Sequence, residues 1–71
     1  MKRVEIQWED VYTAIGWHTP DVVPEPAVIT QVGYVLRKTR KHLVLVSSYD
    51  EEHVGDVTNM PLSLVRKMMR V

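Results

Sequence analysis

Residues 28–48 read VITQVGYVLRKTRKHLVLVSS, and this stretch decides the fold. Its two apolar parts, 28–38 and 42–48, are rich in β-branched residues, which favour strands. Because a short polar connection separates them, the stretch predicts a β-hairpin. Gly33, inside the first strand, predicts a bulge or a sharp bend of the kind that small barrels require. The second strand is apolar enough to be central in the sheet or buried on both faces.

The segment before this hairpin divides into three parts. Apolar and polar side chains alternate over residues 2–8, which is the pattern of a half-buried strand. Residues 9–17 predict a turn or a short helix, because Gly16 would end a helix early. Three of the four prolines fall within residues 18–27. Since proline lacks a backbone donor, this part predicts a long connection or an edge segment in polyproline form.

The segment after the hairpin leaves one choice open. Residues 49–56 (YDEEHVGD) predict an acidic loop, and residues 57–60 predict a short strand that Pro61 interrupts. Residues 62–71 fit an amphipathic helix with one apolar face. They fit equally a single tight turn, Pro61 to Leu64, followed by a final strand of about five residues that pairs with the first. We prefer the turn and strand.

These elements predict a single, mostly β domain over residues 1–71. Five short strands, a long early connection and one helical turn before the last strand are the layout of a small SH3-like or Sm-like barrel. Closing the sheet would remove edges that invite aggregation. The alternative is an α+β roll in which residues 62–71 are helical.

Length and charge restrict the classes of protein. A chain of 71 residues with nine Lys and Arg against nine Asp and Glu is no charge-driven nucleic-acid binder. With no cysteine it has no disulfide framework or thiolate zinc site. The longest aliphatic run, residues 43–46, is far too short for a membrane span. Because so small a core is marginal without disulfides, we expect a soluble protein that forms a homo-oligomer.

The neutral total conceals two charged groups. Basic side chains gather in residues 37–41, and acidic side chains gather in residues 50–56. Such groups on neighbouring copies could align a dimer or a ring.

Several short patterns lie along the chain: Trp8-Glu9-Asp10; Gly16-Trp17 before the Pro-rich segment; Val32-Gly33-Tyr34-Val35-Leu36; Leu43-Val44-Leu45; Ser48-Tyr49-Asp50-Glu51-Glu52; and Met60-Pro61 before a basic, apolar tail. Together they resemble a group of short, uncharacterised proteins of bacteriophages and prophages. The resemblance covers most of the chain and implies a phage origin and a small β-barrel, with no activity attached. By analogy with other small phage proteins, it suggests an inhibitor of host defence in the cytoplasm of an infected bacterium.

The sequence predicts a protein without catalytic machinery. It contains no nucleophile motif and no Gly-rich phosphate loop. His18, His42 and His53 have neither helical nor zinc-finger spacing, so we expect neither a metal nor a cofactor. The acidic residues 50–56 lack the ligand pattern of a calcium loop.

The best candidate ligand site is basic. Arg37, Lys38, Arg40 and Lys41 could hold a phosphate, because guanidinium groups match phosphate oxygens in pairs. The aromatic rings that could stack on a base beside them are those of Tyr34 and Trp17.

We therefore expect a non-enzymatic binding protein. One hypothesis is an anti-defence protein that captures a small anionic signalling nucleotide in a pocket between subunits. The alternatives are a protein–protein inhibitor or adaptor that acts on a host factor, and an Sm-like binder of single-stranded nucleic acid. Zero net charge counts against the last of these.

Overall fold

The computed structural model describes residues 1–11, 16–22 and 25–71. More than half of the chain is in strands, and the described helical structure is limited to two single turns. The elements in chain order are β1 (Arg3–Glu9), η1 (Pro20–Val22), β2 (Val28–Lys38), β3 (His42–Val46), β4 (Ser48–Tyr49), β5 (Val54–Gly55), β6 (Thr58–Pro61), η2 (Leu62–Leu64) and β7 (Val65–Arg70).

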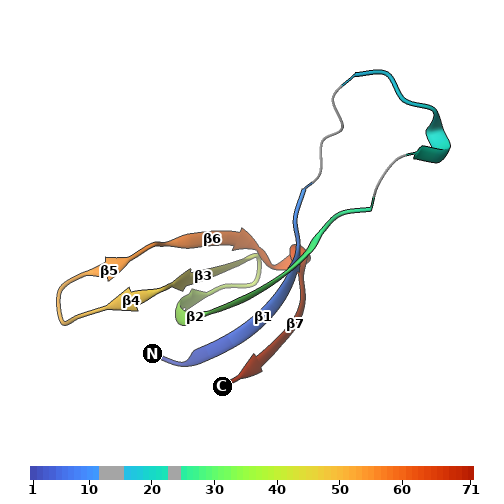
Figure 1. Ribbon diagram of the computed structural model, residues 1–71. Coiled ribbons are helices and arrows are strands. Elements are labelled where there is room, and N and C mark those ends of the chain that lie inside the picture. Colours follow the sequence, from blue (N-terminus) through green and yellow to red (C-terminus); the bar gives the residue numbers. More distant parts are fainter. Residues whose placement is uncertain (12–15, 23–24) are drawn as a thin grey trace.

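Five of the strands form one antiparallel sheet in the order β6-β3-β2-β1-β7 (Figure 1). The predicted mostly β class is confirmed. So are the single turn after Pro61 and the final strand that pairs with the first: Val4 lies opposite Arg70, and Ile6 lies opposite Met68. The helical alternative for residues 62–71 is wrong. Pairing with β1 supplies backbone hydrogen bonds to this segment, whereas so short a helix is only marginally stable by itself.

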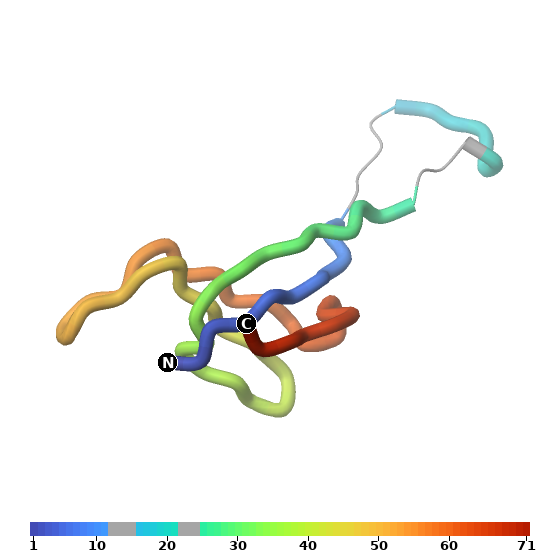
Figure 2. Tube along the Cα trace, turned by 60° about the horizontal axis from the view of Figure 1, so that its bottom comes forward, coloured from blue at the N-terminus to red at the C-terminus, as the bar shows by residue number. Residues whose placement is uncertain are grey.

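The predicted hairpin of residues 28–48 is confirmed as β2 and β3. A register shift lies between Val35 and Arg37, and β2 turns strongly there (Figure 2). The bulge expected at Gly33 is therefore misplaced, since Gly33 pairs in regular register with Val4. Gly33 is needed for another reason. A Cβ atom there would lie 3.2 Å from the carbonyl oxygen of Val46, closer than nine in ten real Cβ contacts.

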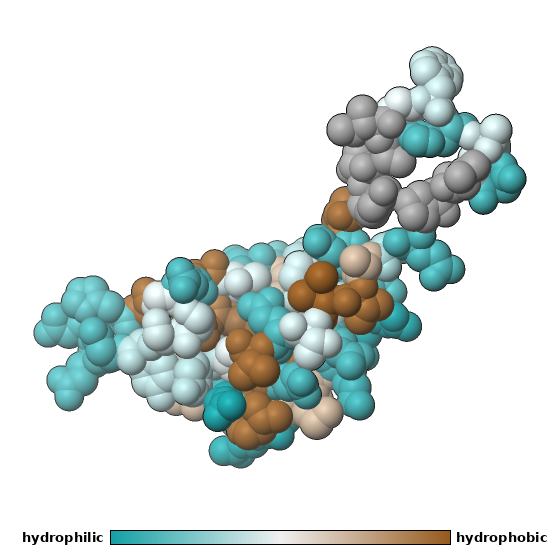
Figure 3. Space-filling view, in the orientation of Figure 1, coloured by the Kyte–Doolittle hydropathy of each residue, from teal (hydrophilic) through white to brown (hydrophobic). Residues whose placement is uncertain are grey.

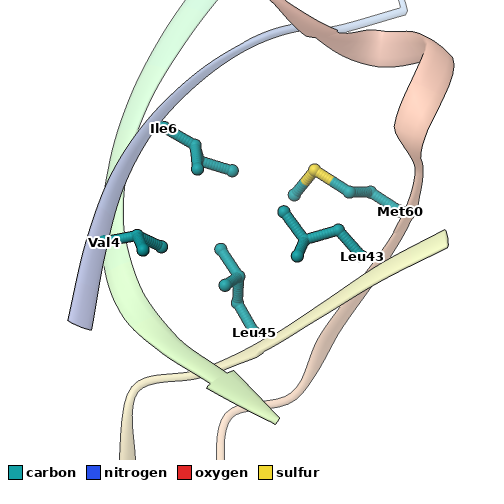
Figure 4. Close-up of a cluster of buried hydrophobic side chains, with 5 residues drawn as sticks. All are labelled: Val4, Ile6, Leu43, Leu45 and Met60. Carbon is teal, nitrogen blue, oxygen red and sulfur yellow. The ribbon is translucent and has the colours of Figure 1, made fainter. Parts of the chain in front are cut away.

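The bend of β2 brings the side chains of β1 and β3 together. These two strands are not neighbours in the sheet, yet their apolar side chains point toward one another across the curved sheet (Figure 4). The core cluster consists of Val4, Ile6, Leu43, Leu45 and Met60. All four residues of 43–46 are buried, which confirms the prediction of a strand buried on both faces.

Residues 49–56 are not the simple loop that was expected. Ser48 and Tyr49 pair with Gly55 and Val54, so β4 and β5 form a small hairpin that projects beyond the main sheet. Only residues 50–53 remain as its tip. Asp50 stabilises this tip: its carboxylate accepts hydrogen bonds from the backbone N–H groups of Glu52 and His53. The sequence pattern missed the hairpin because two-residue strands carry no visible alternation.

Residues 16–22, in the connection between β1 and β2, stand away from the sheet (Figures 1 and 2). The base of this connection is closed by a hydrogen bond of 2.8 Å from the Asp10 N–H to the Ala27 carbonyl oxygen. Of the turn or short helix predicted over residues 9–17, Glu9 belongs to β1 and residues 12–15 lie outside the described part of the structure. We call residues 16–22 and 25–27 the arm. The arm forms no strand, which confirms the predicted long connection for the described part of residues 18–27; residues 23–24 lie outside it.

Within the described residues, no helix has the length and apolar character that a membrane crossing needs.

Candidate anion-binding turn

The connection between β2 and β3 is a well-supported turn. The Thr39 hydroxyl accepts hydrogen bonds from the backbone N–H groups of Lys41 (3.3 Å) and His42 (3.0 Å). The Thr39 N–H in turn donates to the His42 carbonyl oxygen at 2.9 Å. The Lys41 carbonyl oxygen accepts from the Leu62 N–H at 2.8 Å, which ties the turn to η2. The turn is therefore held at a fixed place on the sheet.

Four cationic side chains surround this turn and are exposed to solvent. We call Arg37, Lys38, Arg40 and Lys41 the basic turn. Among the described residues the ion pairs are Arg66 with Glu9 and His53 with Asp50, so none of these four cations has a carboxylate within 4.0 Å. The positive charge of the basic turn is thus uncompensated locally, which favours an anion there.

The two predicted aromatic residues lie elsewhere. Tyr34 pairs with Val46, at the end of β3 away from the basic turn. Its ring meets the ring of Tyr49 edge-on, with centroids 5.1 Å apart, beside a shallow hollow that Ser47 and Ser48 complete. Trp17 is fully exposed on the arm. Within one copy, the structure therefore gathers the four basic residues but brings neither aromatic ring to them.

The acidic group lies at the tip of the β4–β5 hairpin, beyond the end of β3 that is opposite the basic turn. Hydrophilic side chains crowd the end of the β4–β5 hairpin, where Asp50, Glu51 and Glu52 form the tip (Figure 3). The eight residues from His42 to Tyr49 separate this tip from the basic turn, which at strand spacing is roughly 25 Å. The two charged groups foreseen from the sequence are thus well separated within one copy.

The tip explains the one perturbed pKa in the described part of the chain. The backbone N–H of Glu52 and then that of His53 hydrogen-bond the carboxylate and hold the pKa of Asp50 below its ordinary value. The His53 ring nitrogen Nδ1, at 3.2 Å, adds to the effect. The lowered pKa of Asp50 reflects hydrogen bonds that stabilise a turn, and it does not mark a catalytic acid.

Acid should therefore weaken the tip. Because the folded pKa of Asp50 is depressed, its contribution to stability is complete above the ordinary carboxyl range and is lost as the pH falls through the folded pKa, below about pH 4. Thermal melting between pH 6 and pH 2 checks this. The Asp50→Asn variant should lose less stability over that interval than the native chain. Parallel curves would show that the turn bonds do not depend on the charge.

A polar contact that the sequence did not reveal lies beside the core. The Trp8 indole nitrogen donates to the Gln31 side-chain oxygen at 3.1 Å, and the Gln31 amide donates to the Thr58 hydroxyl at 3.5 Å. Trp8 also packs against the core cluster, as its alternation with polar residues predicted. The contact links β1, β2 and β6. Strand pairing and the curvature of the sheet, which carries β6 toward β1 and β2, place these side chains together, so no sequence pattern could have found the contact.

Neither a metal cluster nor a buried ionisable group is found in the described ranges. No three His, Asp or Glu side chains gather there as a cation would require: His42 begins β3, whereas His53 lies in the tip between β4 and β5. No polar or charged side chain among these residues is buried. What these residues offer is a surface with separated charges.

No protein-family model, curated protein or solved structure matches the chain.

Proposed function

We propose that this chain is a non-enzymatic binding domain, built as an SH3-like barrel, that holds an anionic ligand at the basic turn. The single observation that carries this proposal is that no carboxylate lies close to the positive charges of the basic turn. Arg37, Lys38, Arg40 and Lys41 have no carboxylate within 4.0 Å in the described structure, although the chain contains as many acids as bases. The order of the strands, with η2 immediately before the last one, supports the barrel assignment.

The geometry of the turn favours a phosphate. Two arginines and two lysines within five residues combine planar paired donors with mobile point charges, and this combination suits the oxygens of phosphate. The turn is fixed by the Thr39 hydroxyl and by the bond from Leu62, so little ordering is needed when a ligand binds. A ligand that spans several phosphates would engage more of the four cations than a single inorganic phosphate does.

The ligand that we propose is a signalling nucleotide of an infected bacterium. The resemblance to short phage proteins supports a role in countering host defence, by capture of the nucleotide rather than by its chemical conversion. Tyr34 and Trp17 lie away from the basic turn of their own copy. A base that stacks on either ring while its phosphates meet the basic turn therefore requires residues from two copies, which agrees with the expected homo-oligomer.

Two arginine variants test this proposal. Arg37→Ala and Arg40→Ala should each weaken nucleotide binding by about ten- to a hundredfold, because a charge-assisted hydrogen bond contributes roughly 1.5–3 kcal/mol. Binding is measured by the rise in melting temperature with a panel of cyclic and linear nucleotides. Arg66→Ala is the matched control, since Arg66 is an exposed arginine that already pairs with Glu9 at 3.6 Å.

The outcomes separate the functions considered. A rise with one nucleotide that both turn variants reduce, and that Arg66→Ala leaves intact, supports the proposal. No rise with any nucleotide, together with capture of one defined host protein, would establish an inhibitor or adaptor instead. Tight, salt-dependent binding of a labelled single-stranded oligonucleotide would favour the Sm-like alternative.

A further inference from the structure

We infer that the protein forms a two-fold dimer in which the arm of each copy, with Trp17 near its start, lies on strand β7 of the other. The inference concerns a different surface from the basic turn and does not rest on the proposed ligand.

The arm has the composition of a docking segment. Trp17 is fully exposed, at 102% of its reference area, and leaving an indole in water forfeits the apolar burial that such a ring provides elsewhere. The arm carries Asp21 and Glu25, and the chain has no Lys or Arg anywhere in residues 4–36. The arm therefore carries two carboxylates and no Lys or Arg, and it has an aromatic anchor of the kind that dominates interfaces.

Strand β7 has the complementary composition. It lies at the end of the five-stranded sheet and pairs only with β1 among the described strands. Lys67 and Arg70 are exposed and have no carboxylate within 4.0 Å in the part of the chain that is described. Met68 and Met69 are 38% and 43% exposed, and thioethers make favourable contacts with aromatic rings. Because side chains alternate along the strand, Lys67 and Met69 lie on one face and Met68 and Arg70 on the other, so each face offers one cation and one thioether.

The backbone of β7 is also available along its outer side. The Val71 N–H donates to the Arg3 carbonyl oxygen in β1. Because hydrogen-bonding direction alternates along an antiparallel strand, the polar backbone groups of Met68 and Arg70 point away from β1. Direct pairing of two β7 strands would oppose like charges, which disfavours that arrangement. An acidic segment that lies along β7 would meet no such repulsion.

The fold places the arm and β7 where two copies can exchange arms. Glu9, at the base of the arm, pairs with Arg66 at the start of β7, so the two surfaces begin side by side. The arm then runs away from its own sheet in both views of the chain (Figures 1 and 2). A two-fold axis beside this base would carry each arm onto the partner's β7, and the two equal contacts would close the assembly as a dimer.

A charge-exchange experiment tests the dimer. The variant Asp21→Lys with Glu25→Lys places a basic arm against a basic β7, and the variant Lys67→Glu with Arg70→Glu places an acidic arm against an acidic β7. Each should be monomeric in low salt at concentrations where the native chain is a dimer, with the dissociation constant raised at least tenfold. An equimolar mixture should restore the dimer, because both contacts in the mixed pair join opposite charges.

Light scattering after size exclusion gives the mass of each species, and melting curves check that each variant is folded. Glu51→Lys with Glu52→Lys is the matched control, since it makes the same change of charge at the β4–β5 tip and should leave the dimer intact. Trp17→Ala should weaken the dimer at least tenfold without a change of charge. A native chain that is monomeric in low salt, or a mixture that stays monomeric, would overturn the inference, as would a control that dissociates equally.

Discussion

Leu43→Ala is expected to lower the free energy of unfolding by about 3 kcal/mol, the usual cost of a leucine removed from a packed core. The Leu43 side chain is fully buried and belongs to a core cluster of only five residues. A chain of 71 residues has a total stability of about 4–10 kcal/mol. One such cavity therefore removes between about a third and three quarters of the total.

Urea unfolding at 25 °C measures this loss. Val57→Ala is the matched control, because Val57 is 55% exposed and its truncation should change stability by less than about 0.5 kcal/mol. Equal losses in the two variants would mean that the cluster around Leu43 is not the centre of the fold. If the protein dimerises, both measurements belong at one protein concentration, because association adds to the apparent stability.

Gly33→Ala is expected to cost about 1–3 kcal/mol, although it adds only one methyl group. The new Cβ would lie 3.2 Å from the Val46 carbonyl oxygen and 3.4 Å from the Leu45 Cβ. Both neighbours belong to β3, whose residues 43–46 are buried throughout, so neither can move without a shift of the central strand. The cost arises from this close approach of two strands.

Gly55→Ala separates crowding from the general effect of losing a glycine. There the new Cβ would meet the Ser48 hydroxyl oxygen at 2.6 Å, a closer contact than at Gly33. That oxygen ends a rotatable side chain in an exposed hairpin, so it can turn away at a cost below about 1 kcal/mol. Thermal or urea melts of the two variants give the comparison. A loss at Gly55 as large as that at Gly33 would contradict the argument from the rigidity of β3.

The positions of most strands could be predicted because they are local properties. The alternation in β1 and the polar break between β2 and β3 each lie within a few residues. The turn after Pro61 and the final strand also followed from local patterns. The helical alternative for residues 62–71 could not be removed in this way, since the deciding interaction is the pairing of β7 with β1, about sixty residues apart. The β4–β5 hairpin and the place of the bulge likewise depend on pairing.

The candidate site divides in the same way. The basic turn was predictable because its four cations are adjacent in the chain. The separation of Tyr34 from that turn was not, because the bend between Val35 and Arg37 and the pairing with Val46 decide where the ring lies. Its contact with Tyr49 depends on the β4–β5 hairpin, which the sequence did not predict.

By itself, the sequence determined a small, mostly β domain with separated charges, because strand propensity, turn residues and charge are carried by neighbouring residues. Only the tertiary structure decided which strands are neighbours, why Gly33 must lack a side chain, and that the basic turn, the acidic tip and the arm lie apart. Those features arise when a bent sheet brings distant residues into contact. The exposure of the arm and of β7 likewise depends on how the sheet folds.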